Sequence, residues 1–72
     1  MENTETISIV VNGEAKAAAH GATVSQLLGT LGLHAGRVAI ERNLQILPRS
    51  EWPTTRVAAG DRYEIVQFVG GG

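Results

Sequence analysis

The sequence predicts a small α+β domain in which one helix packs against a short mixed sheet. Three observations predict this class: two β-prone runs joined by Asn12-Gly13, an amphipathic segment from Val24 to Leu31, and a last β-prone run from Arg62 to Val69. A chain of 72 residues has room for one core, and 43% hydrophobic residues are enough to build it. We therefore expect one domain over residues 1–68, followed by a flexible glycine tail at 69–72.

The first two strands are predicted from a hairpin pattern. Residues 6–11 are rich in β-branched side chains that alternate between two faces. Asn12-Gly13 follows at once and favours a type I′ turn, because both residues tolerate positive φ. The returning strand, Glu14–Ala19, is rich in alanine and is expected to end at His20-Gly21.

A short helix is predicted after this hairpin. Thr23 and Gln26 form a capping-box pattern, in which the Thr23 hydroxyl accepts the Gln26 N–H and the Gln26 side chain reaches back. Gly32 stands where a left-handed C-terminal cap belongs. Between these signals lies an apolar stripe at helical spacing, formed by Val24, Leu27, Leu28 and Leu31.

The second half of the chain is predicted to hold short strands and an irregular loop. Val38–Arg42 alternates between apolar and polar residues. Ile46-Leu47 is a very short extended piece, closed by Pro48, which cannot donate to a sheet ladder. Arg49–Thr55 is expected to be irregular or a single tight helical turn, and Ala59-Gly60-Asp61 predicts a turn before the last strand.

Composition excludes several classes of function. The chain has no cysteine, so it has no disulfide, thiolate nucleophile or zinc-cysteine site. A net charge of −1 with interspersed acids and bases is not the footprint of a nucleic-acid-binding protein. The apolar runs are too short to span a bilayer and no export leader opens the chain, so we expect no membrane association and a cytoplasmic location.

The chemistry-bearing side chains are few and scattered. The two histidines, His20 and His34, both fall in predicted turns, and no catalytic triad, carboxylate pair or metal cluster can be assembled convincingly. We therefore expect a carrier or a substrate that is not itself an enzyme, with no metal and no bound cofactor.

The sequence ends in Val69-Gly70-Gly71-Gly72, which predicts a thin, pliable thread with a terminal carboxylate. Extended, these residues would reach about 14 Å at about 3.5 Å per residue, enough to enter a partner enzyme. A frayed terminus or a residual linker are the alternative interpretations of the same residues.

The order of hairpin, helix, short strands and final strand is a β-grasp arrangement. Its most discriminating element is Pro48-Arg49-Ser50 after a short strand. Further short motifs along the chain are Val11–Glu14, Ala22–Val24, Leu31–Leu33, Arg37–Glu41, Ile46-Leu47, Gly60-Asp61 and Val69–Gly72. In these motifs the chain resembles the ThiS family, ubiquitin-like sulfur carriers of thiamin biosynthesis. One departure is Arg42–Gln45, where the family usually has an Asn-Gly-Glu turn.

The resemblance implies a carrier mechanism centred on Gly72. A ThiF-like adenylyltransferase, related to ubiquitin-activating enzymes, would use ATP to adenylate the Gly72 carboxylate. A persulfide donor enzyme, or a sulfide donor, would convert that terminus to a thiocarboxylate, and a ThiG-like thiazole synthase would take the sulfur into the thiazole ring. Gly70 and Gly71 would let the tail pass a channel that rejects a Cβ.

A docking surface is also expected beside the tail. In alternation, Val66 and Phe68 face away from Tyr63 and Ile65, which we assign to the helix side. An exposed apolar patch there, together with Val69, Gly70 and Gly71, would bind the partner. The alternative is that Val66 or Phe68 packs under the loop that carries Trp52.

Arg49 has three possible roles on sequence grounds. It could pair with a partner carboxylate or with Glu51, but a solvated surface charge is the favoured interpretation.

Other functions remain open at the level of sequence. Within the same class, the chain could be the small subunit of a molybdopterin synthase or a carrier for cysteine or tRNA thiolation. From other classes, it could be a ubiquitin-like modifier or a plain β-grasp interaction domain. The Pro-Arg-Ser element and the three terminal glycines favour the thiamin branch, and we expect the chain alone to be a monomer.

Overall fold

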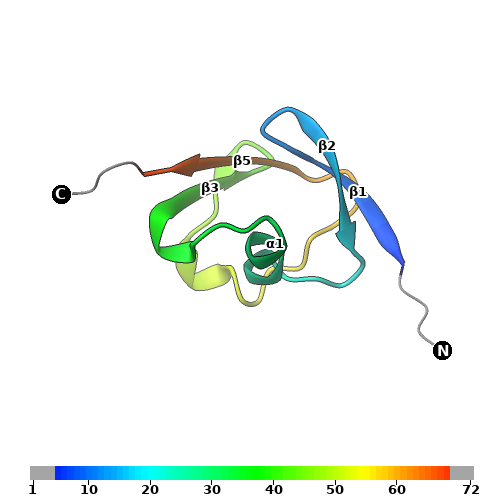
Figure 1. Ribbon diagram of the computed structural model, residues 1–72, viewed down its shortest axis with the longest axis horizontal. Helices are drawn as coiled ribbons and strands as arrows, with labels where there is room; N and C mark the ends of the chain where they lie inside the picture. Colours follow the sequence, from blue (N-terminus) through cyan, green and yellow to red (C-terminus); the bar gives the residue numbers. More distant parts are fainter. Residues whose placement is uncertain (1–4, 69–72) are drawn as a thin grey trace.

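The computed structural model of the protein describes residues 5–68, in which one α-helix packs against a five-stranded sheet (Figure 1). Two short 3₁₀ turns, at Ala35–Arg37 and Arg49–Glu51, lie in the connections. The elements in chain order are β1 (Thr6–Val11), β2 (Glu14–Ala19), α1 (Val24–Thr30), β3 (Val38–Arg42), β4 (Gln45–Ile46) and β5 (Arg62–Gln67).

The first hairpin forms as predicted. Strands β1 and β2 pair antiparallel from Thr6 opposite Ala19 to Val11 opposite Glu14. Asn12 and Gly13 have φ values of 50° and 84°, which are the positive values that a type I′ turn requires. The asparagine-glycine pair therefore fixes the register of the hairpin.

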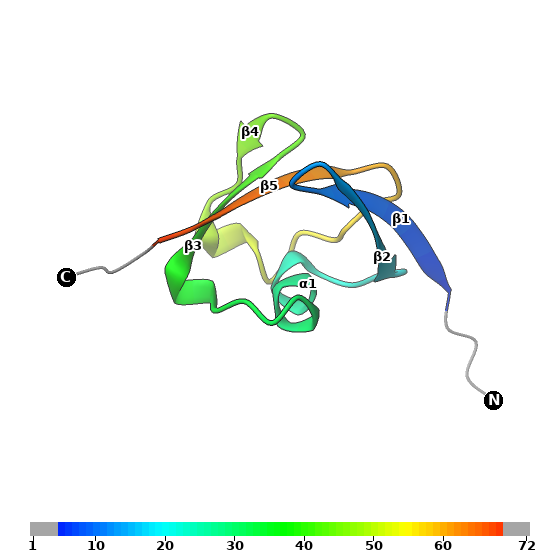
Figure 2. The same ribbon diagram turned by 45° about the horizontal axis from the view of Figure 1, so that its top comes forward.

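The sheet has the strand order β2-β1-β5-β3-β4, with the first and last strands side by side in its middle. Strands β1 and β5 are parallel, whereas the pairs β1–β2, β3–β4 and β3–β5 are antiparallel. Two views place α1 and the 3₁₀ turns on the same side of the strands (Figures 1 and 2). This is the expected β-grasp arrangement, and among residues 5–68 no helix lies on the other face of the sheet, which we call the helix-free face.

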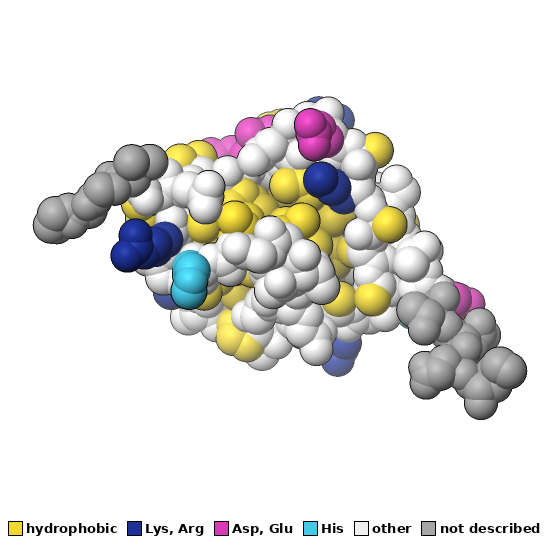
Figure 3. All heavy atoms as spheres, viewed as in Figure 1, with side chains coloured by type: hydrophobic (Ala, Val, Ile, Leu, Met, Phe, Trp, Pro, Cys, Tyr) yellow, Lys and Arg dark blue, Asp and Glu magenta, His cyan; other side chains and the backbone are white. Residues whose placement is uncertain are grey.

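The core fills the space between the sheet and α1. Three residues of the predicted helical stripe, Val24, Leu27 and Leu28, are buried, and Leu31 packs at its margin. In the view of Figure 3, hydrophobic side chains gather in the middle of the visible surface, between the strands and α1, and most charged side chains lie toward its edge. The remaining core residues are Ile9, Val11, Ala18, Val38, Ile40, Trp52, Val57, Tyr63 and Ile65.

Both ends of α1 are capped as predicted. At its start, the Gln26 N–H donates to the Thr23 hydroxyl (3.2 Å) and the Thr23 N–H donates to the Gln26 side chain (2.9 Å). At its end, Gly32 has a φ of 74° and the Leu33 N–H donates to the Leu28 carbonyl (3.0 Å), which is a Schellman motif. Local sequence signals therefore set both limits of the helix.

The β3–β4 turn departs from the expectation by one residue. The predicted extended piece was Ile46-Leu47, whereas β4 is Gln45–Ile46. Asn43 and Leu44 have φ values of 52° and 72° and make a two-residue turn, which places Gln45 directly opposite Arg42. A leucine with positive φ is unusual, so composition did not indicate this turn.

The last strand, β5, ends at Gln67, one residue before Phe68. The predicted strand extended to Val69, which lies outside the described residues. Within residues 5–68, no helix is both long and apolar enough to cross a membrane.

Candidate functional site

The candidate site is the C-terminal end of β5, where the chain leaves the sheet. Phe68 is the last described residue, and its N–H donates to the Arg37 carbonyl (2.8 Å). The predicted reactive residue, Gly72, lies outside the described residues, as do the predicted partner-binding residues Val69, Gly70 and Gly71. The structure therefore describes the base of the predicted tail.

Val66 and Phe68 are both exposed at this end of the sheet. They are 59% and 53% exposed, whereas Tyr63 and Ile65 are buried against the helix side. This confirms the predicted facing of β5. The alternative, in which Val66 or Phe68 packs under the Trp52 loop, is wrong because Trp52 is itself buried in the core while the other two are exposed.

A third apolar residue, Ile46, extends this surface and was missed by the sequence analysis. Ile46 is 77% exposed and pairs opposite Glu41 on β3. Val66 pairs opposite Ala39, so these side chains share the helix-free face. A shallow depression there is lined by Ala39, Ile40, Glu41, Ile46, Glu64 and Val66. We call Ile46, Val66 and Phe68 the apolar surface; such a grouping of exposed apolar residues is typical of a contact site.

Arg49 is exposed, as the favoured interpretation of a surface charge expects, but its guanidinium is also bound to the backbone. The guanidinium donates to the carbonyl oxygens of Ala35 and Val38 (3.3 Å for the latter) and lies 4.8 Å from the centre of the Trp52 ring. Pairing with Glu51 is wrong, because the ion pairs within residues 5–68 are Lys16–Glu14 and Arg42–Asp61. Arg49 therefore ties its 3₁₀ turn to the start of β3.

A buried polar network at the start of β5 was not predicted. Asp61 is 5% exposed and accepts hydrogen bonds from the Tyr63 hydroxyl (2.8 Å), the Arg42 Nε–H (3.0 Å), the Asn43 side-chain amide (3.1 Å) and the Ala58 N–H (2.9 Å). Burial alone would raise the pKa of Asp61, but these hydrogen bonds outweigh it and hold the pKa below its ordinary value. The carboxylate is fully engaged in structure, which argues against a catalytic role.

Two asparagine side chains brace β5 from the neighbouring hairpin turns. The Asn12 side chain accepts from the Ile65 N–H (2.8 Å) and donates to the Ile65 carbonyl (3.1 Å). On the other side, the Arg62 N–H donates to the Asn43 side chain (2.9 Å). These contacts hold β5 between its neighbours where the parallel pairing with β1 is short.

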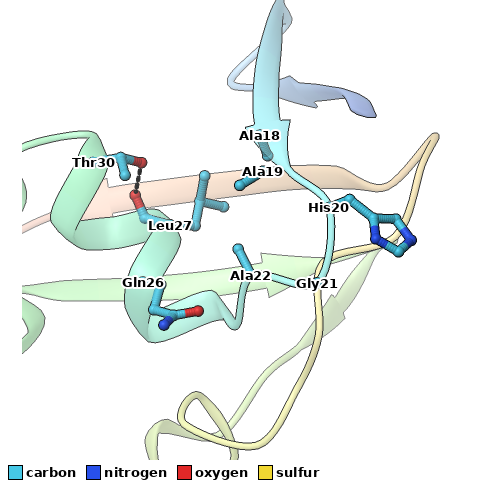
Figure 4. A pocket seen from close by; sticks show the side chains of 8 residues that line it. All are labelled: Ala18, Ala19, His20, Gly21, Ala22, Gln26, Leu27 and Thr30. Carbon is cyan, nitrogen blue, oxygen red and sulfur yellow. Dashed lines mark hydrogen bonds between the residues drawn. The ribbon is translucent and has the colours of Figure 1, made fainter. Parts of the chain in front are cut away.

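The pocket between β2 and α1 offers little chemistry. Its lining is mostly small or apolar, and the His20 ring points away from the helix (Figure 4). The lining residues are Ala18, Ala19, His20, Gly21, Ala22, Gln26, Leu27 and Thr30. Among residues 5–68, no group of three or more metal-binding side chains comes together.

Solved structures resemble this fold closely. The crystal structure of a thiamine biosynthesis protein (ThiS) from Geobacter metallireducens superposes with a TM-score of 0.78 at 33% identity. The match covers 92% of this chain and 100% of that chain.

Curated relatives point to the same group. The sulfur carrier protein ThiS of Escherichia coli is 35% identical over 66 residues, which cover 92% of this chain and 100% of the relative. A thiazole synthase of Paramagnetospirillum magneticum is 46% identical over 66 residues, and one of Magnetococcus marinus is 36% identical. The chain spans 20% of the length of each of these two synthases. Since the sequence model of the ThiS family matches residues 9–72, which include the buried hydrophobic core from Ile9 to Ile65 and the glycine end, this chain belongs to the ThiS family.

Proposed function

We propose that this chain is a sulfur carrier of thiamin biosynthesis and that its Gly72 carboxylate is the group that carries the sulfur. One observation carries the proposal: the family match runs through residue 72, so the three glycines belong to the family's own pattern. This supports a functional tail over a residual linker. The full-length similarity to a sulfur carrier protein supports the same conclusion.

The chemistry requires activation of the carboxylate. A carboxylate is a poor acyl donor because its leaving group would be oxide. Attack of the Gly72 carboxylate on the α-phosphorus of ATP releases pyrophosphate and forms an acyl-adenylate. The outer sulfur of the donor's persulfide then attacks the acyl carbon and AMP leaves with the bonding electron pair, which gives an acyl disulfide. A thiol attacks the donor's sulfur in this acyl disulfide, so that the S–S bond breaks, the thiocarboxylate leaves on Gly72, and the thiol and the donor are joined in a new disulfide. The chain supplies the carbonyl carbon, while an adenylyltransferase supplies the ATP site.

Three partners follow from this chemistry. The first is a ThiF-like adenylyltransferase, the second a persulfide donor enzyme, and the third a ThiG-like thiazole synthase that consumes the sulfur. The third partner is supported by the two thiazole synthases that contain a region similar to this chain. The activity resides in these partners, and the chain acts as carrier and substrate.

The apolar surface is the proposed docking site for these partners. Ile46, Val66 and Phe68 are exposed on the helix-free face, and Phe68 immediately precedes the tail. Burying such side chains at an interface would contribute about 25 cal/mol for each Å² removed from water. Docking there would bring the tail and the partner's reaction centre together.

Gly72→Ala tests the proposal. The variant is expected to fold as the wild type does, and to lose at least about tenfold in ATP–pyrophosphate exchange because a Cβ obstructs a channel shaped for glycine. Deleting residues 71–72 should abolish exchange and leave the unfolding midpoint nearly unchanged. Full-rate exchange by either variant would contradict a reaction at Gly72.

A further inference from the structure

The last described backbone hydrogen bond before the glycines joins two distant parts of the chain. The Phe68 N–H donates to the Arg37 carbonyl (2.8 Å), one residue beyond the end of β5. Arg37 closes the 3₁₀ turn Ala35–Arg37, which begins with a hydrogen bond from the Arg37 N–H to the His34 carbonyl (2.9 Å). The place where the chain leaves the sheet therefore depends on the position of this turn.

Arg49 holds the turn on both sides of Arg37. One guanidinium nitrogen donates to the Ala35 carbonyl and the other to the Val38 carbonyl (3.3 Å). These two carbonyls flank the one that receives Phe68. The planar guanidinium carries N–H donors on two separate nitrogens, so it can bind two carbonyl oxygens at once in a fixed geometry. We call this pair of nitrogens the arginine fork. A lysine ammonium has a single nitrogen and does not offer this arrangement.

The guanidinium rests on a rigid support. It lies 4.8 Å from the centre of the Trp52 ring, and Trp52 is only 3% exposed. The Trp52 indole N–H in turn donates to the Leu47 carbonyl (2.9 Å). Stacking on a fixed aromatic ring restricts where the arginine fork can lie.

We propose that Arg49 is a positioning residue for the carrier tail: it fixes the turn at residues 35–38, so that the Arg37 carbonyl holds Phe68 and sets the point from which the chain continues to Gly72. This inference rests on the proposed function only for its consequence in adenylation. The local consequence, protection of the Phe68 amide, holds whatever the tail does.

Arg56 provides a matched control. Its guanidinium also donates to a backbone carbonyl, that of Gly21, but at the junction of β2 and α1, away from the end of β5 (Figure 1). Arg49→Met and Arg56→Met therefore remove the same kind of contact from two places. Arg49→Lys keeps the charge and removes the fork.

Amide hydrogen exchange followed by NMR tests the local consequence. Arg49→Met is expected to speed exchange at the Phe68 amide roughly five- to tenfold and to leave the Ile65 amide near its wild-type rate, since about one hydrogen bond's worth of protection is lost locally. Arg56→Met should leave Phe68 unchanged. Unchanged exchange at Phe68 in Arg49→Met, or equal acceleration at Phe68 and Ile65, would overturn the positioning role. If Arg49→Met does not fold, the exchange rates of the Phe68 and Ile65 amides are compared in Arg49→Lys, and the same acceleration at Phe68 alone is expected.

Adenylation by the partner enzyme tests the functional consequence. Arg49→Met should lower kcat/KM for adenylation about tenfold relative to Arg56→Met, because it displaces Phe68, which belongs to the proposed docking surface and immediately precedes the tail. Full restoration by Arg49→Lys would show that charge alone suffices and would overturn the fork geometry. Absence of adenylation in the wild type would instead contradict the proposed function, and the Phe68 exchange rate would still decide the role of Arg49.

Discussion

Replacing Asp61 with asparagine tests whether the buried network at the start of β5 stabilises the fold. Oδ2 of Asp61 accepts three hydrogen bonds and Oδ1 accepts one, from Ala58, Tyr63, Arg42 and Asn43. Asn has one acceptor oxygen and one donor NH₂ group. Whichever of the two positions the NH₂ group of the asparagine takes, at least one of the four groups that donate to Asp61 would then face another donor.

The cost follows from this arrangement. Asp61→Asn removes a buried charge paired with Arg42 and leaves a buried donor unsatisfied, which together should lower the free energy of unfolding by about 2–4 kcal/mol at pH 7. A chain of this size is expected to have only about 4–10 kcal/mol in total. Urea unfolding followed by Trp52 fluorescence would measure the loss, and Glu64→Gln, an exposed carboxylate on β5, provides the control.

The effect should depend on pH in a defined direction. The pKa of Asp61 in the folded chain is below its ordinary value of 3.8, because the hydrogen bonds to the carboxylate outweigh the effect of burial. Its stabilisation is therefore present above pH about 4 and is lost as the pH falls through the folded-state pKa. The difference between wild type and Asp61→Asn should shrink at pH 3 and below. A cost under about 0.5 kcal/mol at pH 7, or one that is the same at pH 7 and pH 3, would refute the reasoning.

Three further predictions concern single positions. Leu44→Gly should raise the free energy of unfolding by about 0.5–1 kcal/mol in urea titrations, because Leu44 has a φ of 72° and is 87% exposed; a loss of stability would show that the turn is not strained. Gly29→Ala should raise it by about 1 kcal/mol, since Gly29 lies inside α1 and a Cβ there meets no atom within 4 Å; a lowered melting temperature would contradict that packing. Phe68→Asp should weaken binding to the adenylyltransferase at least about tenfold in calorimetric titration, whereas Ser8→Asp, an exposed change on β1, should not; equal affinities would remove the docking proposal.

The elements that the sequence predicted are those that local signals define. Alternation marked the bounds of β1 and β3, and the capping box at Thr23 with Gly32 marked the limits of α1. In each case the signal that marks the element lies within a short stretch of the sequence, even though the strands themselves pair with distant residues. The facing of Val66 and Phe68 could be predicted for the same reason, because strand alternation decides it.

The features that sequence analysis missed depend on contacts between distant segments. Arg49 bonds to carbonyls 14 and 11 residues away, and the Asn12 side chain bonds to Ile65, 53 residues away. Nothing in the residues around Asp61 indicated that Arg42 and Asn43 would meet it 19 and 18 residues along the chain. These polar contacts form only once the strands have paired, so local patterns did not indicate them.

The carrier account stands on the chemistry of one terminal group, and the intact mass of the chain tests it most directly. After incubation with ATP, its adenylyltransferase, a persulfide donor and a thiol that cleaves the acyl disulfide, the account predicts a mass that corresponds to one oxygen replaced by sulfur, which fragmentation assigns to Gly72. An unchanged mass under conditions in which the partner consumes ATP, or sulfur located at any other residue, would contradict it.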